Sequence, residues 1–217
     1  MFQTSSIESE GGRPAPSRRM ALLLATLLLV LMLPAARTGT AHAAAGAQSA
    51  LAPQALVHAL SSAPLSASEL PAGFSQAGDP QDVSGEVAGL VQGLTGAVAL
   101  PLSGGSSTIA VLGYAVFDTA DDASAAFNLN LSLVPGLTIT SSSTPSGFDS
   151  PAMLDSGSLS LGGFGGIGAS ACAALVDNVV VVGVSAQFGN AQGGSSDDAC
   201  AVAHAGIAHL TAITASS

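Results

Sequence analysis

Positive charge is nearly absent from this sequence of 217 residues, and it is confined to the N-terminal end. The four basic residues are Arg13, Arg18, Arg19 and Arg37, so no lysine or arginine follows position 37. Proteins hold nucleic acids, nucleotide phosphates and anionic membrane surfaces largely through such cationic side chains. The chain beyond residue 37 is therefore not expected to bind nucleic acid or an anionic lipid surface, and its stability must come from burial and hydrogen bonds.

Large aromatic side chains are also scarce, with no tryptophan, one tyrosine and seven phenylalanines. Sugar sites usually stack their ligand on aromatic rings, so a carbohydrate is a less favoured ligand. Disordered segments combine low hydrophobicity with high charge. Here charged residues make up only 8% of the chain and apolar residues 48%, which predicts a folded protein with a core of valine, leucine and alanine.

An apolar run at residues 20–33 follows the first arginines, and small residues ending in Ala41-His42-Ala43 follow the run. This order is typical of a secretory signal peptide, here residues 1–43, with cleavage between Ala43 and Ala44. An uncleaved membrane anchor is the alternative. Fourteen helical residues rise about 21 Å, short of a hydrocarbon core of about 30 Å. A helix that continued to Ala36 would be longer, so the membrane anchor stays open as an alternative.

The adjacent arginines at 18 and 19 leave two export routes open, and the leucine-rich run favours unfolded export over the twin-arginine route. Cleavage after residue 43 leaves 174 residues, enough for one domain with a core. Two of the fourteen acidic residues precede the cleavage, so the remaining side chains carry −12, compared with −10 for the whole chain. We expect an Ala/Ser/Pro-rich N-terminal segment at 44–71, followed by a single domain at 72–217.

Hydrophobic spacing predicts helices at residues 53–60 and 86–100. A run of β-branched and aromatic residues predicts a strand at 108–117. Thr119 and the acids that follow it predict a helix from there to about residue 133. A short strand is expected at 137–142.

The C-terminal third predicts a β-hairpin, in which apolar runs at 167–176 and 179–188 flank Asp177-Asn178. Both turn residues tolerate the positive φ that a two-residue turn requires. The implied register places Leu175 opposite Val180, and both faces near the turn are apolar, so we expect this hairpin inside a sheet. A final helix is expected after Ser195. Its apolar stripe comprises Cys200, Ala203, Ile207 and Leu210.

The order of strand, helix, short strands, hairpin and helix predicts an α+β domain, with a mainly antiparallel sheet and helices packed on it. A ferredoxin-like sandwich also fits this order. Two Asp-Asp-Ala sequences, at 121–123 and 197–199, begin predicted helices and suggest a repeated unit of strand then helix.

A G-x-G-x-x-G pattern at residues 163–168 resembles a dinucleotide-binding loop. Such a loop must follow a strand and open a helix, but the residues after this pattern favour a strand. We therefore interpret it as a flexible or bulged start of a strand, and we expect no cofactor. A glycosylation sequon at Asn130-Leu131-Ser132 falls inside a predicted helix.

Two pairs of neighbouring carboxylates, Asp121-Asp122 and Asp197-Asp198, are of the type used in acid–base chemistry or metal binding. Each pair falls in the first turn of a predicted helix, where the free N–H groups and the helix dipole favour negative charge. We therefore interpret both pairs as parts of helix caps, and we expect no metal site.

The histidines beyond the signal peptide are His58, His204 and His209. His204 and His209 lie five residues apart, about 140° around a helix, so they are not expected to share a metal ion. A hydrolase with a Ser/His/Asp site assembled from distant residues stays open. No G-x-S-x-G elbow supports it, and no lysine can serve as the base.

The only two cysteines, Cys172 and Cys200, are predicted to form a disulfide. An exported protein reaches an oxidising compartment, where such bonds persist. Cys172 lies on the predicted hairpin, and Cys200 lies on the final helix that must pack on the sheet. Gly183, opposite Cys172, leaves room for its sulfur. Two buried free thiols are the alternative.

These observations together predict a secreted or extracytoplasmic protein, in the periplasm or at the cell surface. The favoured function is a non-catalytic binding or envelope-associated module for a neutral or cationic small ligand or a protein partner, because an acidic surface attracts cations. The alternative is an extracytoplasmic hydrolase. Membrane association is expected only if the signal peptide remains uncleaved as an anchor.

Overall fold

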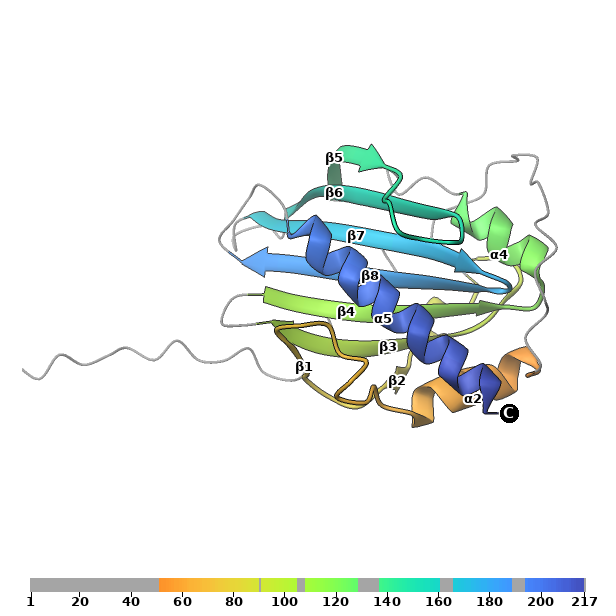
Figure 1. Ribbon diagram of the computed structural model, residues 1–217. Coiled ribbons are helices and arrows are strands. Elements are labelled where there is room, and N and C mark those ends of the chain that lie inside the picture. Colours follow the sequence, from red (N-terminus) through yellow and green to blue (C-terminus); the bar gives the residue numbers. More distant parts are fainter. Residues whose placement is uncertain are drawn as a thin grey trace, which may run out of the picture.

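The computed structural model describes residues 51–89, 91–104, 108–128, 137–160, 166–188 and 194–216. Its centre is an eight-stranded sheet with the order β1-β3-β4-β8-β7-β6-β5, in which β2 also pairs with β3 (Figure 1). The predicted signal peptide at 1–43 and its cleavage site between Ala43 and Ala44 lie outside the described residues.

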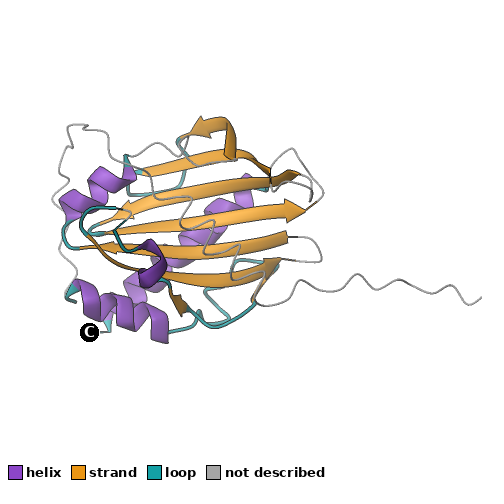
Figure 2. Cartoon of the chain, turned by 180° about the vertical axis from the view of Figure 1, so that it is seen from behind, coloured by secondary structure: helices purple, strands orange, loops and turns teal. Residues whose placement is uncertain are grey.

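Four described helices cover the two faces of the sheet. The strands are β1 (Phe74–Gln76), β2 (Gln81–Asp82), β3 (Leu94–Gly104), β4 (Thr108–Phe117), β5 (Leu137–Ser143), β6 (Ala152–Ser160), β7 (Gly166–Val176) and β8 (Val179–Phe188). The helices are α2 (Pro53–Ser62), α3 (Ser84–Val87), α4 (Ala120–Phe127) and α5 (Ser196–Ala215). Helices α2 and α5 pack on one face, which α5 crosses diagonally (Figure 1), and α3 and α4 pack on the other (Figure 2). Within the described residues, no helix is long and apolar enough to span a membrane.

The predicted α+β class with a mainly antiparallel sheet is confirmed. The ferredoxin-like alternative is wrong for the described part of the chain. Every strand pairing there is antiparallel, and β5, β6, β7 and β8 form a continuous meander, whereas a ferredoxin-like sandwich repeats a split β-α-β unit. The difference arises because β6 joins β5 to β7 directly.

The predicted hairpin is confirmed in its strands and its register, in which Leu175 pairs with Val180. Asp177 has a φ of 51°, the left-handed conformation that a two-residue turn requires. The turn also contacts β4: the Phe117 amide donates to the Asn178 carbonyl oxygen at 2.9 Å, and the Asn178 side-chain amide donates to the Phe117 carbonyl at 2.7 Å. These two hydrogen bonds therefore join the turn of the hairpin to the end of β4.

Alternation along β8 divides the apolar core into two layers. Val179 and Val181 belong to the layer under α2 and α5, whereas Val180 and Val182 belong to the layer under α3 and α4. All four valines are buried, and β8 lies between β4 and β7. The predicted position of the hairpin inside the sheet is therefore confirmed.

Both predicted helix caps are present. The Thr119 hydroxyl accepts from the Asp122 amide at 3.1 Å, and the Ser195 hydroxyl accepts from the Asp198 amide at 3.1 Å. Helix α4 ends at Phe127, and the remainder of the predicted helix, with the Asn130 sequon, lies outside the described residues. The acidic pairs at the starts of α4 and α5 thus occupy the cap positions that the sequence indicated.

The helix predicted at 86–100 is wrong, because α3 ends at Val87 and β3 begins at Leu94. Gly89 and Gly93 have positive φ values of 77° and 73°, which end the helical path. Beyond them, residues 96–102 are buried throughout, so the strand is apolar on both faces. A strand covered on both sides lacks the alternation that would have distinguished it from a helix.

Besides β3, three strands were not predicted: β1, β2 and β6. Strand β6 pairs with β7 over nine positions, although its residues are mainly serine, glycine and other weak strand formers. Strands β1 and β2 are only three and two residues long, and both pair with the outer edge of β3. All three strands form mainly because a neighbouring strand pairs with them, and not because their own residues favour strand.

The helix predicted at 53–60 is confirmed as α2, and it contributes to the core. Leu56, Leu60 and the following Leu65 are buried in the same layer as Leu112 of β4. Proline occupies the first helical position, where its missing N–H costs no hydrogen bond. The described portion of the N-terminal segment 44–71 therefore packs as part of the folded unit.

Candidate functional site

The three histidines have different surroundings. His58 on α2 is exposed, and His204 on α5 is exposed and stacks on the ring of Phe148, with 3.9 Å between ring centroids. His209 on α5 is buried. Among the described residues, no group of three or more histidine, cysteine or acidic side chains is placed to hold a metal ion.

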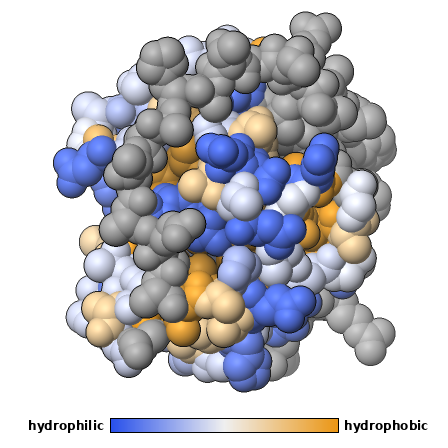
Figure 3. Space-filling view, turned by 90° about the vertical axis from the view of Figure 1, so that its right-hand side faces the viewer, coloured by the Kyte–Doolittle hydropathy of each residue, from blue (hydrophilic) through white to orange (hydrophobic). Residues whose placement is uncertain are grey.

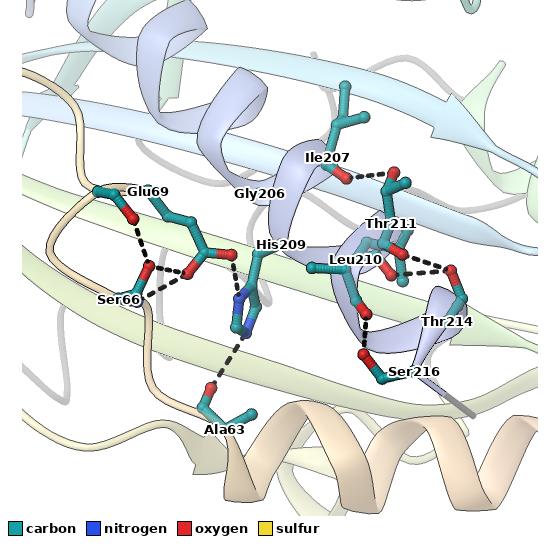
Figure 4. Close-up of polar contacts among 12 residues, drawn as sticks. Ala63, Ser66, Glu69, Gly206, Ile207, His209, Leu210, Thr211, Thr214 and Ser216 are labelled. Carbon is teal, nitrogen blue, oxygen red and sulfur yellow. Dashed lines mark hydrogen bonds and ion pairs between the residues drawn. The ribbon is translucent and has the colours of Figure 1, made fainter.

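His209 forms the centre of the most connected polar cluster in the described chain (Figure 4). Its Nδ1 lies 3.0 Å from Glu69 Oε1, and its Nε2 lies 3.1 Å from the Ala63 carbonyl oxygen. The Ser66 hydroxyl and amide both donate to Glu69 Oε2, at 2.6 and 2.7 Å. The cluster therefore ties the segment after α2 to the last third of α5.

The charge state of this cluster follows from its hydrogen bonds. Burial alone would raise the pKa of Glu69, but hydrogen bonds from Ser66 and the contact with His209 outweigh it and lower that pKa. A carboxylate and a carbonyl oxygen can only accept. Each contact of His209 is therefore a hydrogen bond when the ring nitrogen that faces it carries hydrogen, and the pair with Glu69 is an ion pair when both nitrogens do.

Tyr114 borders the same cluster from β4. Its hydroxyl donates to the Gly206 carbonyl oxygen of α5 at 3.3 Å. Burial, and then the negative charge of Glu69, raise the pKa of Tyr114 far above its ordinary value, so the phenol stays neutral. With His209 engaged at both nitrogens and Tyr114 neutral, this cluster contains no free base, and its evident role is to hold α5 against the segment after α2.

The predicted disulfide is not present: Cys172 and Cys200 are free thiols. The reason is the rotation of α5 about its axis. Ala199 and Ala203, rather than Cys200, sit on Cys172 in the core, and Cys200 packs at the edge of this group. The buried stripe of the helix also includes Val202 and His209, so it is turned relative to the predicted one.

The two thiols lie near enough to each other that each influences the pKa of the other. Burial, and then the hydrogen bond to Cys200, raise the pKa of Cys172 well above its ordinary value. Burial also raises the pKa of Cys200, and the negative charge of Asp197 adds to this, although the bond with Cys172 acts against it. Neither cysteine is therefore an activated nucleophile.

Serine hydroxyls form a second polar group, beneath the first turn of α5. Ser156, Ser170 and Ser185 are register partners on β6, β7 and β8. Ser156 Oγ lies 2.8 Å from Ser170 Oγ and 3.2 Å from Ser196 Oγ, and the Ser170 hydroxyl donates to the Gly194 carbonyl at 2.8 Å. The group was missed in the sequence because β6 was not predicted. Within the described residues, the hydrogen bonds of this group join serine hydroxyls to one another and to the Gly194 carbonyl, and none of them involves a histidine.

Asp155 is a buried acid on the other face of β6. The residue is 7% exposed, and its Oδ1 has no hydrogen-bond partner among the described residues. Its register partners are Ala171 on β7 and Ser142 on β5. Sequence analysis had not singled out Asp155, because an acid within an unpredicted strand resembles any loop acid.

Acidic side chains also gather at one end of the sheet. Asp118 follows β4, Asp121 and Asp122 begin α4, and Asp177 forms the turn after β7. Figure 3 shows hydrophilic side chains grouped across this end of the molecule, with apolar ones beside them. These acids serve the turn and the helix cap, as predicted for Asp121-Asp122, and together they give this end a negative field.

The dinucleotide-like pattern at 163–168 falls partly outside the described residues. Its last three residues, 166–168, belong to strand β7 and not to a helix. A helix must follow a phosphate-binding loop to direct its N–H groups at the ligand. The reading of this pattern as the start of a strand is therefore confirmed for its described part.

No protein-family model and no curated protein matches the sequence. Among solved structures, the chain is similar to the extracellular domain of PknH from Mycobacterium tuberculosis, with 13% sequence identity and a TM-score of 0.42. The match covers 75% of this chain and 97% of that chain. A likeness of this extent carries no conclusion about the activity of the protein.

Proposed function

We propose that residues 44–217 form an exported, non-catalytic binding domain of the cell envelope, which recognises a cationic or neutral ligand or protein partner. The observation that carries this proposal is the one-sided charge of the folded surface. All twelve acids beyond the signal peptide lie in the described chain, seven of them exposed, and no lysine or arginine follows residue 37. An unneutralised negative surface attracts cationic partners over a distance of about 10 Å at 0.1 M salt.

The surroundings of the histidines favour binding over hydrolysis. A serine hydrolase needs an imidazole nitrogen within hydrogen-bond reach of a serine hydroxyl. In the described chain, His209 contacts Glu69 and Ala63, and His204 stacks on Phe148. A dispersed Ser/His/Asp site therefore has no observation in its favour.

The proposal is tested with the protein purified from its own host. A fluorophosphonate probe is expected to leave its mass unchanged, and native mass measurement is expected to reveal any ligand or partner that copurifies. A lysine-rich peptide should bind more tightly than a glutamate-rich peptide of equal length, and the difference should shrink as salt is raised from 50 to 500 mM. Labelling of one serine by the probe would replace this proposal with a hydrolase.

Processing at the predicted site is a separate prediction. Export should remove residues 1–43, so N-terminal sequencing of the exported protein is expected to begin at Ala44. The physical basis is the length of the apolar run, which is too short to span the membrane comfortably. Exported protein that begins near Met1 would contradict cleavage and favour the alternative, in which the N-terminal segment stays as a membrane anchor.

The lack of basic residues predicts a negative binding result. At physiological salt, the exported protein should show no measurable affinity for duplex DNA and no retention on heparin, since it offers phosphates and sulfates no cationic side chain. Fluorescence anisotropy with labelled DNA, from low to high salt, measures this directly. A micromolar dissociation constant for DNA that rises steeply with salt would contradict both the predicted removal of residues 1–43 and the predicted cationic or neutral class of partner.

A further inference from the structure

A run of hydroxyl side chains lies along the outermost strand of the sheet and the loop that follows it. Seven of the nine residues at 138–146 are serine or threonine, and all seven are exposed. Strand β5 is the last in the sheet order and pairs only with β6 in the described chain (Figure 1). A group attached to these side chains would therefore extend into solvent without meeting another strand of the described chain.

Most of these hydroxyl groups make no hydrogen bond within the described residues. Thr140 is the exception, because its hydroxyl donates to the Ser156 carbonyl oxygen at 3.1 Å. The other six, at positions 138, 141–144 and 146, have no partner there. Hydroxyl groups on α5 differ, because Thr211, Thr214 and Ser216 each donate to a carbonyl oxygen of the preceding turn. The hydroxyls at 141–144 thus contribute no hydrogen bond to the described fold, and their oxygens are free to react.

The edge of β5 lacks the charges that usually protect such a strand. Edge strands are commonly kept from pairing with another chain by charged side chains, proline or a bulge. No charged residue occurs between Asp122 and Asp149, and only a bulge between Ile139 and Ser141 interrupts β5. A bulky, hydrated group on its side chains would keep a second strand away.

The charge of the chain indicates which kind of group fits this segment. A phosphate would add about two negative charges, which arginine side chains normally pair. The side chains beyond residue 43 already carry −12 and include no lysine or arginine. A sugar is neutral and adds no repulsion. Serine- and threonine-rich sequence that includes proline, here Pro145, is also typical of O-glycosylated segments.

We propose that the hydroxyl groups at 141–144 are acceptors for O-linked sugars, which are added to the exported protein and cover the edge of β5. In this step the hydroxyl oxygen attacks the anomeric carbon of a glycosyl phosphate donor. A bond forms between that carbon and the side-chain oxygen, the bond from the carbon to the donor phosphate breaks, and the phosphate leaves with the electron pair. The hydroxyl proton passes to a base of the transferase. The proposal depends on export but not on the ligand of the binding domain.

The experiment uses the protein purified from its own host and a variant with four substitutions, Ser141→Ala/Ser142→Ala/Ser143→Ala/Thr144→Ala. The control variant is Ser61→Ala/Ser62→Ala on α2, where both hydroxyls donate to the His58 carbonyl oxygen. Intact masses are compared with the mass calculated for the unmodified chain. Digestion before aspartate then separates residues 122–148, which contain the whole hydroxyl run, from 155–176 and 177–196, which contain the serine group beneath α5.

The wild type and the control variant should exceed the unmodified mass by whole multiples of a sugar residue, carried by the peptide 122–148. The four-alanine variant should lose at least nine-tenths of this excess. Its midpoint of unfolding should stay within about 3 °C of that of the wild type, because exposed hydroxyls without partners contribute little to stability. Fragmentation of the wild-type peptide by electron transfer locates the sugars independently of the variant.

Several outcomes would overturn the proposal: an unmodified mass of the wild type, a sugar at Asn130 alone, a phosphate in place of a sugar, or an equal sugar content in the four-alanine variant. None of them affects the proposed binding function, because the lysine-rich peptide tests that function separately. Labelling by the fluorophosphonate probe would instead end the binding function and leave the sugar sites in place.

Discussion

Replacement of Gly183 by alanine should lower the free energy of unfolding by about 3 kcal/mol. Gly183 lies on β8 directly under α5. A Cβ atom there would come within 2.1 Å of the Ala199 carbonyl oxygen and 2.5 Å of the Ala203 nitrogen. Both are backbone atoms, so the helix itself would have to move away from the sheet.

Thermal and urea unfolding measure this effect, and the expected drop in the midpoint is about 6–12 °C for a domain of this size. Gly85→Ala is the matched control. Gly85 lies in α3, no atom would come within 4 Å of its added Cβ, and alanine favours helix. Equal midpoints for Gly183→Ala and Gly85→Ala would show that α5 does not rest on β8 at this closeness.

The second large effect is expected at the ion pair between Glu69 and His209. Its side chains are 20% and 7% exposed, respectively, so the pair is only partly screened by water. Removal of one partner leaves the other buried without its hydrogen bonds. His209→Ala should therefore lower the free energy of unfolding by about 2–3 kcal/mol, whereas His58→Ala, at an exposed position on α2, should change it by less than about 0.5 kcal/mol.

The same pair predicts an acid dependence with a definite sign. The pKa of Glu69 is lower in the folded protein than in the unfolded chain, where it is about 4.3. Its contribution is therefore fully present above that pH and is lost as the pH falls through the lower, folded pKa. Urea unfolding from pH 7 to pH 3 should show a smaller acid loss for Glu69→Gln than for the wild type. Parallel curves would mean that Glu69 is not stabilised as a carboxylate.

Local signals in the sequence were sufficient for the hairpin and the helix starts. The turn at Asp177-Asn178 set the register of β7 and β8, because a two-residue turn allows only one pairing of the flanking residues. Thr119 and Ser195 marked the starts of α4 and α5 because their hydroxyls satisfy free amides at a helix start. Such signals act within a few residues, so they can be recognised without knowing the fold.

Features set by distant neighbours could not be predicted in the same way. Strand β6 has a weak composition of its own and exists because β5 and β7 pair with it. The rotation of α5 that places Ala199 and Ala203, rather than Cys200, on Cys172 involves the close approach of Gly183, which lies seventeen residues before Cys200 on β8. Asp155 could be recognised as a buried acid only when its strand and its pairing with β7 were known.

The pairing of β4 with β8 has a consequence for the order of folding. The pairings within residues 94–117 and within residues 137–188 join strands that are close in the chain, whereas β4 and β8 are far apart in it. Long-range pairings form slowly, because a large loop must close, at a cost in chain entropy, before any contact between the strands can compensate for that cost. Helix α5 follows both strands in the chain and packs on both β4 and β8. The two parts of the sheet are thus expected to form first and to be held together only when α5 packs across them, so that a chain still crossing a membrane remains unassembled until α5 has emerged.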